Sequence, residues 1–392
     1  MSICQILGLW TNETEKDREN MMLSVFRLEE YFSPWEFKAP YLLCCSDAES
    51  RSLEEILSLA DDQSKLLWSR LHLGYTEVKG LPILRNEIAK LYQGLELENV
   101  VCFAGAEEGI FCSMQALVKE GDHVIVLTPC YQSLEDLPHH FGARVTAVRL
   151  KEENRWQMDI NAIEDALTPS TRLIIINFPH NPTGAVLTDD QASALIDLAR
   201  KRGIYIFSDE VFRLLGPSST TWGLPIAVRY ERGVSLGVMS KAFGLAGLRV
   251  GWIVTQDKDL LHQAEIAKHY TSICNSAPSE VLSLMALRSK DAVLRRNIEI
   301  VDKNLGLLDD FFDRHGERFS WVRPQGGCVG FVHYKAHRPI DELAEALVHK
   351  QGVLLMPSRI YDFPGNYFRI GFGRKNMPEA LVRFEAFLEE WE

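Results

Sequence analysis

The stretch SKAFGLAGLRVGW, residues 240–252, directly follows the apolar run GVSLGVM (233–239). Its lysine, Lys241, therefore stands at the end of a predicted strand, and Arg249 follows eight positions later. An amine in such a place can bond covalently to a bound aldehyde, while a nearby guanidinium can hold a phosphate. The glycines within the stretch let the backbone approach a ligand closely. An isolated Ser-Lys pair would be an ordinary surface feature, but this combination predicts a ligand-binding lysine.

Around this stretch, from about residue 80 to 255, short β-rich runs alternate with amphipathic segments. The alternation is typical of βαβ units and predicts a mainly parallel sheet covered by helices. The segment QASALIDLARKRG (191–203) has its apolar residues on one helical face and basic residues near its C-terminal end. Such a sheet binds its ligand where strands end and loops begin. The predicted strands are HVIVLTP (123–129), RVTAVRL (144–150), RLIIINF (172–178), IYIFSD (204–209), GVSLGVM (233–239) and VGWIVT (250–255).

A different pattern begins near residue 285, where long helical stretches precede short strands and a closing helix. DAVLRRNIEIVDKNLGLLDDFFDRHG (291–316) is one such helical stretch, and YFRIGFG (367–373) is one of the short strands. We therefore expect a large ligand-binding domain over residues 46–284 and a small domain over residues 285–392. Residues 1–45, rich in aromatics and acids, are expected to form an N-terminal arm and part of the small domain.

The bulk composition narrows the classes of partner. The 392 residues carry a formal net charge of −12, and this acidic balance disfavours nucleic acid and anionic membranes, which select clustered Lys and Arg. No apolar run approaches the roughly 20 residues of a membrane span, and the N-terminus lacks the basic flank and cleavage site of a signal peptide. The eight cysteines lack the paired spacings of a zinc site, so no metal is expected. Scattered free thiols indicate a reducing, cytoplasmic location, with a small molecule as partner.

Further polar motifs stand at the ends of the predicted strands or before helices. HNPTG (180–184) follows one strand, although Asn-Pro and Thr-Gly also make a good turn. SDEVF (208–212) ends the next strand, and its Asp209 can serve a ligand or cap a helix. GAEEGIFCSMQAL (105–117) places glycine before a helix start, where unpaired N–H donors and the positive dipole end favour a phosphate. All three motifs are candidates for the same site as Lys241.

In this order the motifs resemble those of the fold-type-I, class I/II aminotransferases, and the matches run across nearly the whole chain. The resemblance implies pyridoxal 5'-phosphate as cofactor, carried by Lys241 as a Schiff base. It also implies the fold: an α/β protein of aminotransferase fold type I, with a mainly parallel seven-stranded sheet in the large domain and a smaller α+β domain.

The resemblance assigns the neighbouring residues to parts of the cofactor. Asn181 would hydrogen-bond the ring hydroxyl, and Asp209 would keep the pyridine nitrogen protonated, so that the ring can withdraw electrons. Tyr131, in TPCYQS (128–133), would stack on the ring, the alternative being an ordinary exposed tyrosine. The phosphate end would be bound by Arg249, Ser240 and the backbone N–H groups of Ala106 and Glu107.

Two further positions extend the resemblance beyond the cofactor. In GYTEVKGLPILR (74–85), Tyr75 matches a tyrosine that reaches the phosphate of the neighbouring subunit, which implies a homodimer with shared active sites. In YFRIGFG (367–373), Arg369 matches the arginine that clamps the substrate α-carboxylate, and its planar fork suits bidentate pairing. Arg374 is close enough to compete for this role.

One position departs from the pattern of many relatives. Where they carry a tyrosine three residues after the ring aspartate, this chain has Phe212. The missing hydroxyl removes a donor to the ring oxygen, which is expected to alter the pKa of the Schiff base and the electron distribution in the ring. Phe212 therefore favours a reaction other than conventional transamination.

The resemblance implies one opening and two continuations for the reaction. An amino acid would displace Lys241 from the cofactor to form an external aldimine, and the freed lysine would remove the α-proton. Transamination to a 2-oxo acid is one continuation, and loss of a β or γ leaving group followed by addition of a nucleophile is the other. A third reading, a non-catalytic effector-sensing domain of a transcription regulator, requires a DNA-binding module, for which this acidic chain leaves no room.

The segment EEYFSPWEFKAPYLLCCSDAESRSLEEI (29–56) lies where relatives build the substrate pocket. Its Glu36, Asp47 and Glu49 can meet a cationic group such as a guanidinium, or they are solvated loop acids. The segment also resembles enzymes close to capreomycidine synthase, which cyclise hydroxylated arginines. Together with Phe212 it favours a cyclodehydratase that converts γ-hydroxyarginine to a cyclic guanidino amino acid of the enduracididine type, with transamination as the alternative.

Overall fold

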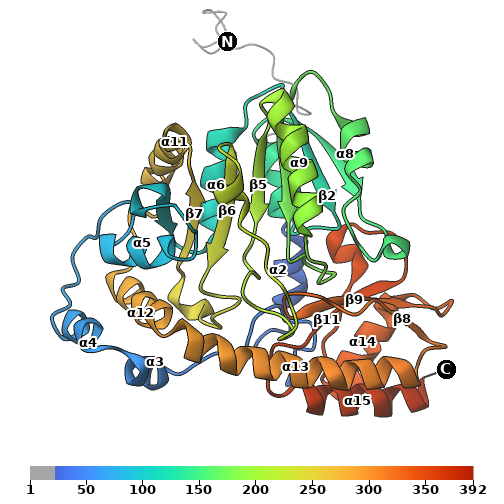
Figure 1. The fold of residues 1–392 in the computed structure, drawn as a ribbon. Helices are drawn as coiled ribbons and strands as arrows, with labels where there is room; N and C mark the ends of the chain where they lie inside the picture. Colours follow the sequence, from blue (N-terminus) through green and yellow to red (C-terminus); the bar gives the residue numbers. More distant parts are fainter. Residues whose placement is uncertain (1–22, 392) are drawn as a thin grey trace, which may run out of the picture.

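The computed structural model describes residues 23–391, so that residues 1–22 of the expected N-terminal arm lie outside the described residues. A sheet with strand order β1-β7-β6-β5-β4-β2-β3 occupies the centre of the molecule (Figure 1). β7 runs antiparallel to β1 and β6, and the other neighbouring pairs are parallel, which confirms the predicted mainly parallel seven-stranded sheet. Its strands are β1 (Val100–Phe103), β2 (His123–Thr128), β3 (Arg144–Arg149), β4 (Thr171–Asn177), β5 (Tyr205–Asp209), β6 (Gly233–Val238) and β7 (Gly251–Thr255).

β1 is the strand of this sheet that was not predicted from the sequence. Its four residues, VVCF, are all buried, so the run is short and shows no alternation of apolar and polar positions. It pairs with β7 at the edge of the sheet, with Val100 opposite Val254 and Phe103 opposite Gly251. The other six strands coincide with the predicted runs to within one residue at each end.

Helices cover both faces of the sheet, because alternate residues of each strand belong to two different apolar cores. In β2, for example, Val124 and Val126 belong to one core and Ile125 and Leu127 to the other. None of the helices within residues 23–391 is long and apolar enough to cross a membrane. The first core includes residues of α5 (Pro82–Ala89), α6 (Ala106–Leu117), α7 (Ser133–His140), α11 (Lys258–His269) and α12 (Ala277–Arg288), and the second includes residues of α8 (Ile160–Ala166), α9 (Asp189–Arg202) and α10 (Ile226–Arg229).

A second, antiparallel sheet with strand order β10-β11-β9-β8 forms the smaller α+β unit predicted for the C-terminal part (Figure 1). Aromatic contacts join it to its helices: Phe319 lies 6.2 Å from Phe311 and 6.0 Å from Phe384, between ring centroids. The domain boundaries after residues 45 and 284 stay a prediction. The elements of this unit are β8 (Phe319–Trp321), β9 (Val329–Tyr334), β10 (Met356–Pro357), β11 (Tyr367–Gly371), α13 (Lys290–Arg314), α14 (Ile340–Gln351) and α15 (Met377–Glu390).

The N-terminal part of the described chain connects the two units. α2 (Arg27–Phe32) donates a hydrogen bond to each unit: the Arg27 N–H donates to Gln132 Oε1 at 2.8 Å, and the Tyr31 hydroxyl donates to the Leu355 carbonyl at 2.6 Å. α2 therefore lies across the junction between the large sheet and the small one. The remaining elements are α3 (Leu53–Leu59), α4 (Asp62–Ser69) and the 3₁₀ helices η2 (Leu97–Asn99), η3 (Glu152–Asn154), η4 (Ala246–Leu248) and η5 (Ser358–Tyr361).

Residues 43–49, which we call the crossing segment, lie directly against the end of β11. Gly371 N–H donates to the Leu43 carbonyl at 2.7 Å, and Glu49 N–H donates to the Gly373 carbonyl at 2.8 Å. A Cβ atom at position 371 would lie 2.0 Å from the Cys45 carbonyl oxygen, and one at 373 would lie 2.4 Å from a backbone oxygen. Only glycine allows the two backbones to come this close.

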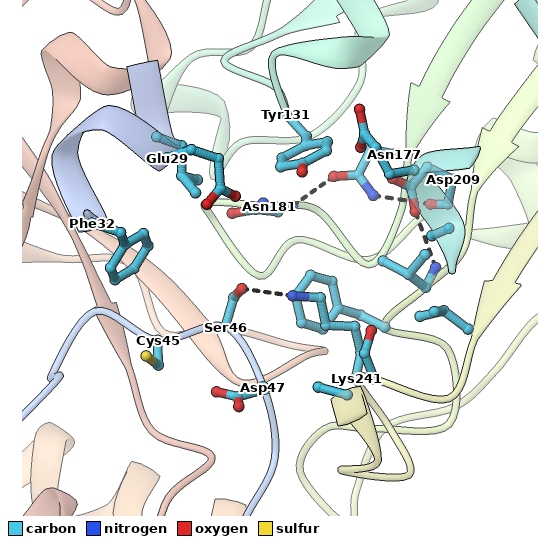
Figure 2. Close-up of a pocket in the computed structure, with 18 of the residues that line it drawn as sticks. Glu29, Phe32, Cys45, Ser46, Asp47, Tyr131, Asn177, Asn181, Asp209 and Lys241 are labelled. Atoms are coloured by element: carbon cyan, nitrogen blue, oxygen red, sulfur yellow. Dashed lines mark hydrogen bonds between the residues drawn. The ribbon is translucent and has the colours of Figure 1, made fainter. Parts of the chain in front are cut away.

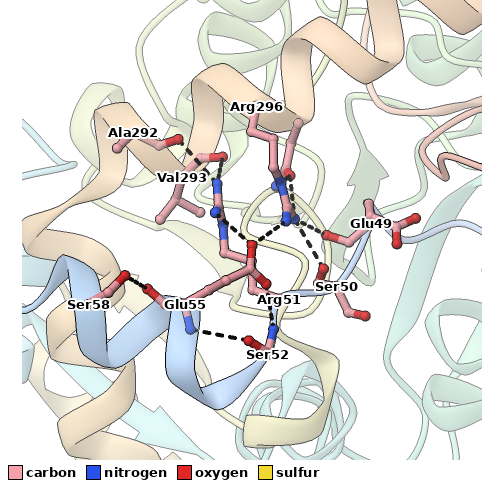
Figure 3. A network of polar contacts seen from close by, with 10 residues as sticks. Glu49, Ser50, Arg51, Ser52, Glu55, Ser58, Ala292, Val293 and Arg296 are labelled. Carbon is pink, nitrogen blue, oxygen red and sulfur yellow. Dashed lines mark hydrogen bonds and ion pairs between the residues drawn. The ribbon is translucent and has the colours of Figure 1, made fainter.

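A polar network ties the chain after the crossing segment to α13 (Figure 3). Arg296 of α13 donates to the Glu49 and Ser50 carbonyls, and Arg51 donates to the Ala292 carbonyl at 3.2 Å. Glu55 Oε1 forms ion pairs with both arginines, at 3.5 Å to Arg51 and 3.4 Å to Arg296. Several shared partners hold this stretch in place more firmly than a single exposed ion pair would.

Replacement of Gly371 tests the crossing. The Gly371→Ala variant is expected to lose about 1–3 kcal/mol of stability, because its methyl group would overlap the Cys45 carbonyl. Gly306, within α13, is the control: its added Cβ would meet nothing within 4 Å, and alanine in a helix is favoured over glycine by about 1 kcal/mol. Urea unfolding midpoints should fall for Gly371→Ala and stay or rise for Gly306→Ala; an unchanged midpoint for Gly371→Ala would mean that the crossing is not required.

Candidate active site

A cavity lies at the carboxyl ends of β4, β5 and β6, where the large unit meets β11 and α2 (Figure 2). Parallel strands end at one edge of their sheet, so residues far apart in sequence gather there. Tyr75 lies outside this cavity, and 91% of its surface is exposed in the single chain. Glu49, one of the three acids proposed to meet a cationic substrate, is not among its lining residues either. The remaining residues assigned from the sequence line the cavity: Ala106, Glu107, Tyr131, Asn181, Asp209, Ser240, Lys241, Arg249, Arg369, Glu36 and Asp47.

Lys241 follows β6 and its side chain is partly buried. Its Nζ donates to the Ser46 hydroxyl of the crossing segment at 2.8 Å (Figure 2) and lies 5.6 Å from the centroid of the Phe212 ring. Burial lowers the pKa of Lys241 from its ordinary value, because the charged ammonium loses its hydration. The neutral amine, which is the nucleophilic form, is therefore favoured at lower pH than in a solvated lysine.

Asp209 ends β5 and is 4% exposed. Val211 N–H donates to its Oδ1 at 3.1 Å, yet burial raises the pKa of the carboxyl group to about 7. Among residues 23–391 it takes part in no ion pair, and although the charge of Lys241 acts to lower its pKa, no cationic partner is in contact with this buried acid. A protonated pyridine nitrogen is such a partner, and the position therefore fits the ring of pyridoxal phosphate.

Asn181 and Arg369 meet on one side of the cavity. Arg369 is 1% exposed; its Nε donates to the Cys44 carbonyl at 2.9 Å and its Nη1 to Asn181 Oδ1 at 3.2 Å. The backbone N–H of Asn181 donates to Asn177 Oδ1 at 2.9 Å, which fixes the turn after β4 (Figure 2). The Asn181 amide thus has its oxygen occupied and its NH₂ group left for a ligand.

The start of α6 fits a phosphate. Gly105 precedes the helix with φ 96° and supplies no side-chain cap, so the first-turn N–H groups at Ala106 and Glu107 are not capped by a side chain of that residue. The guanidinium of Arg249 lies over Gly105, where an added Cβ would be 2.5 Å from Nη2. Backbone donors, a positive helix end and an arginine therefore converge at one point.

Tyr131 and the side chain of Glu107 lie together beside this point. Glu107 accepts from the Ser133 hydroxyl and interacts with the Tyr131 hydroxyl, and burial raises the pKa of its carboxyl group. Phe26 contacts the Tyr131 ring, with 5.5 Å between centroids, so the predicted stacking tyrosine is held from the side of α2. Its ring faces the cavity, as the proposed stacking role requires (Figure 2).

The acids predicted to meet a cationic substrate have different surroundings. Asp47 is paired with Arg374, which donates from Nε at 3.1 Å and from Nη2 at 2.9 Å. Glu49 accepts the Lys375 N–H at 2.9 Å. The charge of Asp47 is thus matched by the protein itself, and Arg374, the competitor of Arg369, is engaged by it. Glu36 lines the cavity without a hydrogen-bond or ion-pair partner for its carboxylate among residues 23–391.

Three groups in or beside the cavity are not predicted from the sequence. Glu29, on α2, projects into the cavity (Figure 2), and Ser46 holds the Lys241 amine. Tyr361, at the end of η5, donates from its hydroxyl to Asn181 Oδ1 at 3.0 Å. Glu29 and Ser46 lie in the substrate-pocket segment 29–56, but no pattern distinguishes them from its other residues, and Tyr361 stands in no motif. Glu29 is one acid of an amphipathic turn, and an aromatic such as Tyr361 reads as a core residue.

Comparisons with known proteins agree with this geometry. Residues 45–384 match the family model of aminotransferase class I and II. Capreomycidine synthase of Streptomyces vinaceus is 31% identical over 286 residues, which cover 73% of this chain and 72% of the relative. Arginine–pyruvate transaminase of Pseudomonas aeruginosa is 33% identical over 363 residues, with 87% and 88% coverage. Among solved structures, the PLP-dependent cyclase OrfR has a TM-score of 0.86 at 26% identity and covers 95% of this chain and 98% of its own.

The family model spans most of the chain, and the similarities to a synthase, a transaminase and a solved cyclase each cover more than two thirds of it. Its members use pyridoxal phosphate, which the buried acid at the end of β5 and the uncapped start of α6 fit. The chain is therefore an enzyme that belongs to the aminotransferase class I and II family and uses pyridoxal 5'-phosphate.

Proposed function

We propose that this enzyme is a cytoplasmic cyclodehydratase that converts γ-hydroxyarginine to a cyclic guanidino amino acid. The observation that carries the proposal is the charge in the cavity. Arg369 can take the α-carboxylate, while Glu29 and Glu36 line the same cavity with carboxylates that have no partner among residues 23–391. An amino acid with a carboxylate at one end and a guanidinium at the other matches both charges.

Unpartnered carboxylates select the side chain of the substrate. A guanidinium pairs with a carboxylate through two parallel N–H···O bonds, whereas an acidic side chain would be repelled by Glu29 and Glu36. Asp47 does not add to this selection, because Arg374 already neutralises it. The cavity thus favours arginine-like amino acids over aspartate or glutamate.

The chemistry follows from the groups around Lys241. The bound cofactor supplies an electron sink for the charge that develops when the α-proton leaves. The Lys241 amine is the base that takes this proton, and the Ser46 hydroxyl at 2.8 Å orients it. A β-proton also leaves, because the γ-carbon is not adjacent to the α-carbon, and the γ-hydroxyl departs as water with the proton that Lys241 has taken. A guanidino nitrogen then forms the new C–N bond to the γ-carbon, and the proton that this nitrogen loses and the β-proton restore the C–H bonds at the α- and β-carbons. One water is lost, and no oxidant, reductant or second substrate is consumed.

Two observations support a cyclase: the relatives that this chain resembles and the residue at position 212. Capreomycidine synthase and OrfR are named as a synthase and a cyclase, and both resemble this chain over most of its length. Phe212, which is 1% exposed and lines the cavity, stands where many transaminases carry a ring-binding tyrosine. The hydroxyl that they use at the ring oxygen is absent at this position.

We also propose that the active enzyme is a homodimer in which Tyr75 reaches the phosphate in the neighbouring subunit. Tyr75 is a large aromatic residue with 91% of its surface exposed in the single chain, and such residues are frequent at protein interfaces.

Transamination of arginine is the second candidate. The similarity to arginine–pyruvate transaminase, at 33% identity, favours it specifically, because the same Arg369 and acidic groups would bind arginine. The two candidates differ in what leaves the enzyme: water and a ring in one case, a 2-oxo acid in the other.

A product assay separates them. With γ-hydroxyarginine alone, and no 2-oxo acid added, mass spectrometry should show a cyclic product lighter by one water. The Lys241→Ala variant should form none, because it lacks the base, whereas Lys201→Ala, at an exposed lysine of α9, should be fully active. Accumulation of a 2-oxo acid, or turnover only when pyruvate is supplied with arginine, would identify a transaminase instead.

Neutralising the unpartnered acids tests guanidinium recognition. Glu29→Gln and Glu36→Gln should each raise KM for guanidino substrates about tenfold, since a charge-assisted pair is replaced by a neutral hydrogen bond. Glu30→Gln is the matched control, because Glu30 follows Glu29 on α2 and is exposed as Glu29 and Glu36 are, but it does not line the cavity. Steady-state kinetics should leave this control unchanged. If the three variants behave alike, the acids do not recognise the substrate.

The buried acid Asp209 gives a pH prediction for the cofactor-free protein. Because burial raises its pKa to about 7, the folded protein keeps a proton that the unfolded chain has lost between about pH 4 and pH 7. Its contribution to the free energy of unfolding therefore falls as pH rises through this window. Glu280, whose pKa is also raised to about 7 by burial, contributes equally to wild type and variant.

Urea midpoints at about pH 5 and about pH 8 measure this contribution. Wild type should lose more stability than Asp209→Asn between the two pH values, and adding cofactor should reduce the difference, because a protonated ring nitrogen stabilises the carboxylate. Parallel pH dependence of the two cofactor-free proteins would show that Asp209 is not a buried titrating group.

A further inference from the structure

The hydroxyl of Tyr361 lies inside the protein beside the candidate cofactor site. Tyr361 is 5% exposed, and its oxygen lies 3.0 Å from Asn181 Oδ1 and 2.5 Å from Arg369 Nη1. Arg369 Nη1 also lies 3.2 Å from Asn181 Oδ1. Three side chains, from the turn after β4, from η5 and from β11, thus form a closed triangle of hydrogen bonds.

The donors and acceptors in this triangle have only one consistent assignment. Arginine has no acceptor, so Arg369 donates to both the tyrosine oxygen and the amide oxygen. The single proton of Tyr361 is then donated to Asn181 Oδ1. Burial raises the pKa of Tyr361 to about 12, so the hydroxyl keeps this proton over the working range of the enzyme.

The orientation of the Asn181 amide follows from that assignment. With two donors on its oxygen, the amide cannot flip without facing its NH₂ group toward the arginine and losing both bonds. Its backbone N–H is also fixed, by Asn177 Oδ1 at 2.9 Å. The NH₂ group is therefore the end that Asn181 offers to the cavity it lines.

This orientation matters more here than in a relative with a tyrosine at position 212. Phe212 has no hydroxyl to donate, so the ring oxygen of the cofactor depends on Asn181 for its side-chain donor. We propose that Tyr361 is a positioning residue whose hydroxyl holds the Asn181 side chain with its NH₂ group toward the ring oxygen of the cofactor. The inference rests on the proposed cofactor contact of Asn181 and is independent of the substrate.

The test is a pH titration of the visible absorbance of the lysine-bound cofactor, in the holoenzyme without substrate. A donor to the ring oxygen stabilises negative charge there and weakens the hold of that oxygen on the proton of the lysine–cofactor linkage. Tyr361→Phe keeps the ring, which contacts Phe331 at 6.0 Å between centroids, and removes only the hydroxyl. We expect its titration midpoint to rise by about half a pH unit or more, because a buried neutral hydrogen bond is lost.

Tyr367→Phe is the matched control. Tyr367 also contacts the Phe331 ring, at 5.2 Å, but its hydroxyl donates to Glu152 Oε2 at 2.8 Å and lies outside the cavity lining. Its loss should leave the midpoint unchanged. Thermal unfolding of each variant monitors the fold, so that a midpoint shift is compared only among folded proteins.

A double-variant cycle distinguishes positioning from an independent effect. Asn181→Ser should raise the midpoint at least as much as Tyr361→Phe, and combining the two should add nothing further, because Tyr361 acts through Asn181. An unchanged midpoint in Tyr361→Phe, or shifts that add in full, would overturn the proposal. A wild-type protein that titrates normally but makes no cyclic product would overturn the proposed reaction alone, since the titration contains no substrate.

Discussion

The crossing of two backbones at glycine is the constraint on which the site depends. Residues 43–49 can reach the cavity only because positions 371 and 373 have no side chain, where a Cβ would meet carbonyl oxygens. The crossing brings Ser46 to the Lys241 amine and Asp47 to Arg374. It also brings the Cys44 carbonyl to Arg369 on the same strand. The large and small units are thus joined at the point where chemistry is proposed.

Burial then determines what each charged group can do. Lys241 and Asp209 are both desolvated, and each is shifted toward its neutral form, which leaves one ready to act as a nucleophile and the other in need of a cation. Arg374 and Asp47 satisfy each other. Arg369 is held by neutral oxygens only, so its positive charge is still available to a carboxylate. Arg374 is thus neutralised and Arg369 is not. The available charge of Arg369, more than the set of lining residues, supports a ligand with a carboxylate, such as an amino acid.

The part of the site that was predicted from sequence is the part encoded in local motifs. Lys241, Asp209 and Asn181 each stand within a short pattern at the end of a predicted strand, and those strands were found because their apolar runs are long enough to recognise. β1, with four buried residues, was too short. Its register against β7 depends on pairing across the sheet and has no local signal.

Contacts between segments that are distant in the sequence could not be predicted from local patterns. Tyr361 and Asn181 are 180 positions apart, and Asp47 and Arg374 are 327 apart, so no pattern in the sequence joins them. The prediction that Asp47 would meet the substrate considered its charge without the arginine that the fold places beside it. Glu29 could not be predicted, because nothing in the local sequence distinguishes a cavity-lining acid from a solvated one.

The position of the cofactor is the central claim, and a comparison of Lys241 with the fully buried Lys268 provides a sharp test of it. Lys268 is saturated by three acceptors, the Val78 and Cys102 carbonyls and Asn275 Oδ1, at 2.6, 2.7 and 2.6 Å. Lys241 has one hydrogen-bond partner among residues 23–391, the Ser46 hydroxyl, and lines the cavity. Reduction of the holoenzyme with borohydride, followed by peptide mass mapping, fixes the cofactor on the lysine that carries it. We predict the added mass on Lys241; the added mass on any other lysine, or on none, would contradict the assignment of the active site.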